Sequence, residues 1–209
     1  ITGPVTSVTQ LFEDPKLKGK VTALSGMGDT MGLVMLDNGD DPASVTDAAW
    51  SSALTRMQSA VDSGQIRRFT GNDYAQPLAK GDLAAAVAWS GDIYQLLSTN
   101  DKLRWALPTK GGMIWTDNMI IPTGGSAATA STYMNSVYDP KVAAKIAAYV
   151  AYVPPVKGTQ EELAKIDPEL AKNPLVFPPD STLANAHQFD PTALNNQAFI
   201  EQWQKVLGA

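Results

Sequence analysis

Hydrophobic and polar positions along the first part of the chain follow the periods of strands and helices in turn. A short apolar run over residues 20–24 ends at a Ser-Gly-Met-Gly turn, which predicts a strand followed by a helix that begins at Asp29 and ends near Gly39. Residues 44–64 then carry apolar side chains three and four positions apart, which predicts a longer helix capped at Ser44.

The middle of the chain adds further strands and one more helix. Residues 83–89 are apolar throughout, as expected of a strand that is covered on both faces. Residues 103–107 and 119–121 are also predicted as strands, and Asp139-Pro140 predicts the start of a helix. Strands that alternate with helices across short turns predict an α/β domain with a mostly parallel sheet.

The last third of the chain is richer in proline and is predicted to form shorter helices than the rest. Prolines separate short helical pieces after residue 153, and residues 193–207 form an amphipathic segment with Phe199, Trp203 and Val206 on one side. Such a tail is typical of a chain that passes between two lobes, and equally of a surface strap on a single domain.

Composition excludes several classes of function. The net charge of -5 leaves no basic stripe for a nucleic-acid partner. The absence of cysteine excludes disulfides and zinc–thiolate sites, and a single histidine supplies a catalytic dyad poorly, so no metal or cofactor is expected. No apolar run is long enough to span a membrane, and the first residues lack the layout of a secretory signal. We therefore expect either a processed protein or a piece of a longer one.

Two pairs of aromatic and acidic residues are the strongest candidates for a binding site. Trp89 and Asp92 follow the predicted strand at its carboxyl end, where ligands gather in α/β sheets. Trp115 and Asp117 are two positions apart in extended chain, so their side chains point to the same side. Carboxylates beside aromatic rings suit an organic cation. The alternatives are a core tryptophan, a helix-capping aspartate and an ordinary strand edge.

Three further positions carry less specific signals. Asp29 follows a glycine-rich turn that lacks the lysine and the spacing of a phosphate-binding loop, so a helix cap explains it as well. Tyr152 precedes two prolines, and its ring either packs on them or faces a ligand. Gln188 lies in a polar cluster with His187 that is equally consistent with a surface loop.

The order of these residues resembles the polyamine-binding proteins of bacterial ABC importers, of the spermidine/putrescine type. The resemblance runs from Leu11 to the end of the chain and is carried by Phe12-Glu-Asp-Pro-Lys-Leu-Lys-Gly-Lys20, Lys80-Gly-Asp-Leu83, Trp89-Ser-Gly91, Lys110-Gly-Gly-Met-Ile-Trp-Thr-Asp117, Ile121-Pro122, Asp139-Pro140 and Tyr152-Val-Pro154. The most specific of these is the glycine pair with Trp-x-Asp before a segment that ends in Ile-Pro.

This resemblance implies a type II periplasmic-binding-protein-like α/β fold, in which two lobes close over an extended amine. Aromatic rings then line the methylene chain of the ligand, and acids pair with its ammonium ends. The ligand-binding residues that it implies are Trp89, Trp115, Asp117 and Tyr152, with Asp29 where the family often has a glutamate and Gln188 where it has a polar residue. A second acid of the family is replaced by Gly26, and Asp92 could supply the missing charge.

The resemblance also implies that most of the first lobe is missing from the chain. Residues 1–115 and 160–209 are expected to form the second lobe, and residues 116–159 a crossover segment with part of the first lobe. The strand predicted at 119–121 would then have an exposed edge, which invites dimerisation or proteolysis.

The leading hypothesis is a non-catalytic receptor outside the cytoplasm, in the periplasm or at the cell surface. A lipid anchor in the full-length protein is one way in which it could be held at the membrane. It would capture a di- or polyamine and deliver it to the membrane permease of an ABC importer. One alternative is a binding protein for a sugar or another neutral solute, because tryptophans also stack on pyranose rings. An enzymatic alternative uses Asp92 and Asp117 as the acid and base of a hydrolase.

Overall fold

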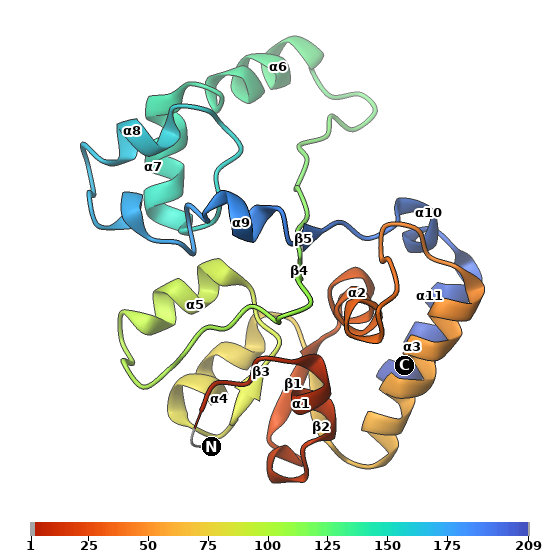
Figure 1. Cartoon of the computed structure of the whole chain (residues 1–209). Helices are drawn as coiled ribbons and strands as arrows, with labels where there is room; N and C mark the ends of the chain where they lie inside the picture. Colours follow the sequence, from red (N-terminus) through yellow and green to blue (C-terminus); the bar gives the residue numbers. More distant parts are fainter. Residues whose placement is uncertain (1–2, 209) are drawn as a thin grey trace. The chain divides into compact units, whose positions relative to one another are not determined.

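The computed structural model describes residues 3–208, which divide into two compact units (Figure 1). Unit 1 comprises the described residues up to Trp89, then Leu96–Trp115 and the chain from Ala184 onward. Unit 2 comprises Ser90–Gln95 and Thr116–Leu183. The chain therefore enters unit 2 twice, first for a single short segment and then for a long one.

A parallel three-stranded sheet organises unit 1. The central strand β1 (Val21–Leu24) is fully buried and lies between β2 (Ile66–Thr70) and β3 (Ala85–Ala86). The predicted strand at 20–24 is confirmed, whereas the one at 83–89 is reduced to two residues. The backbone leaves the sheet after Val87, whose N–H donates to the Thr22 carbonyl at 3.0 Å.

Helices pack around this sheet, and unit 1 also contains a second, two-stranded ladder. The unit 1 helices are α1 (Val8–Glu13), η1 (Pro15–Leu17), α2 (Met27–Asn38), α3 (Asp47–Asp62), η2 (Asn72–Tyr74), α4 (Ala75–Lys80), α10 (Pro191–Leu194) and α11 (Gln197–Leu207). Helix α5 (Ser90–Leu97) begins in unit 2, and its last two residues belong to unit 1. The ladder pairs β4 (Gly112–Met113) with β5 (Ala186–His187) in parallel.

The predicted helix starts were wrong by a few residues. Helix α2 is capped by Gly26 and not by Asp29, which lies in its first turn. Helix α3 is capped by Thr46, whose hydroxyl accepts the Ala49 N–H at 3.2 Å, so the cap predicted at Ser44 is wrong. The end of α2 at Gly39 is as predicted, with a left-handed φ of 91°.

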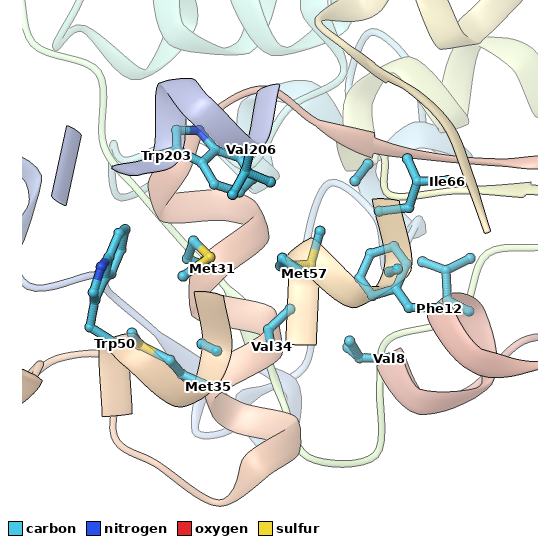
Figure 2. Packing of buried hydrophobic residues seen from close by; sticks show 14 of the residues in the cluster. Val8, Phe12, Met31, Val34, Met35, Trp50, Met57, Ile66, Trp203 and Val206 are labelled. Carbon is cyan, nitrogen blue, oxygen red and sulfur yellow. The ribbon is translucent and has the colours of Figure 1, made fainter. Parts of the chain in front are cut away.

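The core of unit 1 joins the C-terminal helix to the sheet and to α2 and α3 (Figure 2). Trp50 of α3 stacks on Phe199 of α11, with ring centroids 4.4 Å apart. The Trp203 indole N–H donates to the Ser25 carbonyl at 2.8 Å, directly before the cap of α2. The predicted stripe of the amphipathic tail is therefore confirmed, although the tail forms two helices. Its packing holds the start of α2 in place.

The regular secondary structure in the described part of unit 2 is helical, and loops connect the helices. Its complete helices are α6 (Ala127–Ser136), α7 (Pro140–Val150), α8 (Thr159–Leu163), η3 (Leu170–Lys172) and α9 (Asp180–Leu183). The Asp139 side chain caps α7 by accepting the Lys141 N–H at 2.8 Å, and Pro140 is the first helical residue, as predicted. A small core of alanines on α7 packs against Leu163, Leu170 and Val176.

Two predicted strands are absent from the structure. Residues 103–107 and 119–121 form no ladder with any described part of the chain, and the side chain of Ile120 is 82% exposed. The predicted boundary before Thr116 coincides with a unit boundary, but the chain returns to unit 1 at Ala184 and not at residue 160. The reason is that the segment after residue 160 packs on α7. Whether the units correspond to the lobes of the family stays a prediction.

Candidate binding residues in each unit

Trp89 is fixed just beyond the carboxyl end of β3 in unit 1. Its backbone N–H donates to the Tyr74 hydroxyl at 3.0 Å, and the two rings meet edge to face with centroids 6.4 Å apart. Tyr74 itself is buried. Trp89 is half-buried and does not belong to the hydrophobic core cluster, so the structure disfavours the alternative of a core tryptophan.

Trp115 lies beside Trp89, with ring centroids 6.2 Å apart at a tilt of 55°. It follows β4, which is held in place by the bond from the Ile114 N–H to the His187 carbonyl at 2.9 Å. The Trp115 side chain is 46% exposed. Two tryptophans that the sequence placed in separate motifs thus form one aromatic surface, and Trp115 presents much of it to solvent.

Asp29 brings an acid to this surface. Its carboxylate folds back over Gly26, where a methyl group would overlap Oδ2. Burial raises the pKa of the Asp29 carboxyl above its usual value, and the nearby Trp89 indole N–H opposes that rise. The Trp89 Nε1 is nevertheless buried without an acceptor in hydrogen-bonding geometry among the described residues, so this contact falls short of a full hydrogen bond.

Gln188 is exposed and directly follows β5. The next residue, Phe189, is buried and lies against Gly28, where its Cβ would be 3.4 Å from a methyl group on the glycine. Because Gly28 precedes Asp29, the segment that carries Gln188 runs along the first turn of α2. Gln188 therefore lies in the same region of unit 1 as Asp29.

Unit 2 holds a second group of candidates. The Tyr152 hydroxyl donates to Asp92 Oδ1 at 3.1 Å. Burial and the negative charge of Asp92 raise the pKa of the Tyr152 phenol well above its ordinary value, and the charge of Asp117 adds to this rise. Both acids, Asp92 and Asp117, therefore act on the Tyr152 phenol.

The position of Tyr152 follows from the end of α7. Ala151 caps that helix in a left-handed conformation with φ of 57°, and it is the one non-glycine residue with positive φ among residues 3–208. The turn aims the Tyr152 ring at Asp92, so the alternative that it only packs on the following prolines is disfavoured. Asp92 lies in the first turn of α5 and is not the cap, which is Trp89.

Sequence reasoning missed Tyr74, Gly91 and Ala151, which position the candidates. A buried tyrosine needs a partner for its hydroxyl, but only the fold shows that the partner of Tyr74 is Trp89. Gly91 and Ala151 are small residues whose importance depends on the ring that lies beside them. The sequence signal of Gly91 is its place in the Trp89-Ser-Gly91 motif, whereas Ala151 is marked only by its position directly before Tyr152.

The described residues offer little support for metal binding or a membrane span. In residues 3–208 no group of three or more His, Cys, Asp or Glu side chains could hold a metal ion. None of the described helices is long and apolar enough to cross a membrane. The candidates therefore consist of carboxylates, aromatic rings and one amide.

A model of the bacterial extracellular solute-binding protein family matches residues 2–178. The chain belongs to this family. It is 26% identical over 121 residues to the putrescine-binding periplasmic protein PotF of Escherichia coli K12, which covers 54% of the chain and 32% of PotF. The match thus spans about a third of the length of PotF.

Solved structures establish the fold. A putative spermidine/putrescine ABC transporter protein from Listeria monocytogenes superposes with a TM-score of 0.80 at 24% identity, over 96% of this chain and 60% of that one. The binding protein AgtB of Agrobacterium tumefaciens, solved with agropinic acid, superposes with a TM-score of 0.70 at 17% identity, over 98% of this chain and 63% of that one. The predicted α/β fold of the type II periplasmic binding proteins is confirmed.

Proposed function

We propose that this chain carries ligand-binding residues of an extracytoplasmic receptor that captures a di- or polyamine of the putrescine and spermidine class. The observation that carries the proposal is that each unit pairs acids with aromatic rings. Unit 1 places Asp29 beside Trp89, with Trp115 next to that ring, and unit 2 places Asp92 and Asp117 around Tyr152. Ammonium groups need such acids, and methylene chains need such rings.

The expected energies are adequate for this function. A cation over an aromatic ring contributes about 0.5 to 2 kcal/mol, depending on desolvation. A hydrogen bond between an ammonium and a carboxylate contributes about 1.5 to 3 kcal/mol. Two hydrogen bonds of this kind and two or three ring contacts add to roughly 4 to 12 kcal/mol. The loss of translational and rotational freedom on binding reduces this sum, and micromolar affinity requires that about 8 kcal/mol remain.

The names of relatives support the amine, whereas the fold alone does not select it. PotF is named for putrescine, and the Listeria protein for spermidine and putrescine. AgtB shares the fold but was solved with agropinic acid. The choice of an amine therefore rests on the acids beside the rings and not on the architecture.

The proposal includes delivery to the permease of an ABC importer and a periplasmic or cell-surface location, and membership of an extracellular solute-binding family supports both. A lipid anchor in the full-length protein belongs to the same proposal. We further propose that unit 1 corresponds to the second lobe of such receptors and unit 2 to part of the first.

A role as a non-catalytic receptor is part of the proposal too. The rival hydrolase would use Asp92 and Asp117 as its acid and base, and turnover of a substrate would distinguish it from a receptor.

Calorimetric titration of the chain with putrescine, spermidine and maltose, at low and high salt, tests the proposal against the neutral-solute alternative. We expect saturable binding of an amine that weakens as salt screens the carboxylates, and no binding of maltose. Binding of maltose with an affinity that salt leaves unchanged would favour the neutral solute. Continuing heat from turnover of any of these three compounds would support the hydrolase alternative.

A further inference from the structure

The ring of Tyr152 occupies the space that a side chain at Gly91 would need. Gly91 is buried and is the second residue of α5, directly before Asp92. A methyl group on Gly91 would overlap Cδ2 and Cε2 of Tyr152 and would lie 2.7 Å from Cζ. Carbon atoms do not approach one another so closely, so any larger residue at position 91 must displace the ring.

The ring is held on both sides and cannot easily move away. Its hydroxyl is bonded to Asp92 Oδ1 at 3.1 Å, at the far end of the ring from the backbone. On the backbone side, Ala151 is 1% exposed and has its left-handed turn closed by a bond from its N–H to the Ala147 carbonyl at 2.9 Å. A ring that is fixed at both ends gives way less readily than the tip of a flexible side chain.

Backbone conformation does not explain the glycine. Gly91 is not among the glycines with positive φ, so an alanine could adopt its conformation. Alanine is also favoured over glycine within a helix because it loses less backbone entropy on folding. The close approach of Tyr152 is therefore the reason that remains for a glycine here.

We propose that Gly91 is a positioning residue for ligand binding, because its missing side chain lets the Tyr152 ring lie on the first turn of α5 with its hydroxyl on Asp92. The inference rests on the proposed function, in which both residues contact the amine. A side chain at position 91 would push the ring outward, lengthen the bond to Asp92 and misplace an aromatic surface together with an acid.

A double-mutant cycle in urea denaturation tests the contact without any ligand. Gly91→Ala is made in the wild-type chain and in a Tyr152→Ala chain, where the ring that would collide is gone. We expect Gly91→Ala to lower the denaturation midpoint in the wild type and to leave it unchanged or raise it in Tyr152→Ala. An equal shift in both chains, or no shift in the wild type, overturns the inference.

Gly28→Ala is the matched control for helix propensity. Gly28 is likewise the second residue of its helix, α2, but a methyl group there would meet its nearest neighbours at 3.4 Å, an ordinary contact distance. This variant should not lower the midpoint, and its response should be the same with and without Tyr152. A dependence on Tyr152 as large as that of Gly91→Ala would contradict the local origin of the effect.

Putrescine titration of the same variants tests the role in binding. We expect Gly91→Ala to weaken binding at least tenfold when it is made in the wild-type chain. In the Tyr152→Ala chain, we expect the double variant to bind less than twofold more weakly than Tyr152→Ala alone. Full affinity in Gly91→Ala overturns the positioning role, even where the denaturation cycle shows coupling. If the wild-type chain binds no amine, the proposed function and the positioning role fall together, while the cycle still decides whether the contact exists.

Discussion

Tyr152 and Asp92 are 60 positions apart in the sequence, yet the hydroxyl of the first donates to a carboxylate oxygen of the second at 3.1 Å. Removal of that hydroxyl alone should weaken the binding of putrescine. We expect Tyr152→Phe to bind roughly tenfold less tightly or weaker still, since a hydrogen bond to a charged group contributes about 1.5 to 3 kcal/mol. Isothermal titration calorimetry measures the change.

Tyr149→Phe is the control for this variant. Tyr149 lies on α7, the helix that ends just before Ala151 and Tyr152, and it is 87% exposed, so its hydroxyl is not expected to matter for binding. Equal affinities for Tyr152→Phe and the wild type would show that the bond to Asp92 does not contribute to the site.

The pH dependence of binding should report on Asp29. Burial raises the pKa of this carboxyl, so it takes up a proton at a higher pH than an ordinary aspartate and then loses its attraction for an ammonium. Putrescine affinity should therefore fall as pH drops, beginning above the normal aspartate range. Asp29→Asn should bind more weakly at neutral pH and lose this step.

The same shift has a consequence for the stability of the free chain. The pKa of Asp29 is higher in the folded state than in the unfolded state. At a pH between these two pKa values, folding is therefore coupled to the uptake of a proton. At higher pH the carboxylate is ionised in both states, and its burial opposes folding. Asp29→Asn should thus be at least as stable as the wild type at pH 7. A clear loss of stability at pH 7 would show that the carboxylate is well satisfied in the free protein.

Arg56 should be a major contributor to the stability of unit 1 at neutral pH. It lies 2.8 Å from Asp37 on α2 and 2.7 Å from Glu13 on α1, and it donates to Asn38 Oδ1 at 2.8 Å. Arg56→Met should lower the free energy of unfolding by about 2 kcal/mol, because Asp37 loses its charged partner. Chemical denaturation at pH 7 measures this loss.

Acid should remove the same contribution. The pKa of Asp37 is lowered: burial acts to raise it, but the bonds from Thr9 and Arg56 outweigh that effect. A carboxyl whose pKa is lower in the folded state than in the unfolded state stabilises the protein at pH values above its unfolded-state pKa. This stabilisation is lost as the pH falls through the folded-state pKa. The difference between Arg56→Met and the wild type should therefore shrink in acid. A difference that stays constant with pH would exclude the ion pair as its cause.

The exposed apolar side chains of unit 2 predict self-association of the isolated chain. Ile120 is 82% exposed and Tyr149 87% exposed, and helix α6 has no buried residue. Ile120→Lys combined with Tyr149→Lys should reduce concentration-dependent association in sedimentation velocity. Leu194→Lys, at an exposed apolar position in unit 1, is the control and should change it little. Equal association of all three chains would place the contact elsewhere.

Local signals in the sequence were sufficient for several features. The cap at Asp139, the buried strand β1 and the apolar stripe of the C-terminal helix depend on neighbours within a few residues, and all three are found. The meeting of Trp89 with Trp115 depends on how separate segments pack. It was reached only through the family resemblance, and the structure brings the two rings together.

Other features depended on tertiary contacts that no local pattern carries. Strand β2 has two exposed arginines in its middle and lacks regular alternation, so it went unpredicted. Residues 119–121 have strand-forming side chains but no partner strand in the described chain, and a strand without a ladder does not form. The Asp29 carboxylate packs against Gly26, and the Tyr152 ring packs against Gly91. Both are steric contacts that depend on the fold, so residue types alone do not predict them.

The most direct test of the central claim is a putrescine titration followed by tryptophan fluorescence, in the wild type and in Trp115→Phe. Trp50 and Trp203 are buried in the core, whereas Trp115 is 46% exposed beside Trp89. We expect a saturable, salt-sensitive change in emission that is greatly reduced in Trp115→Phe, together with weaker binding. An unchanged response in that variant, or no response of the wild type to any amine, would contradict the assignment of these aromatic and acidic residues to an amine site.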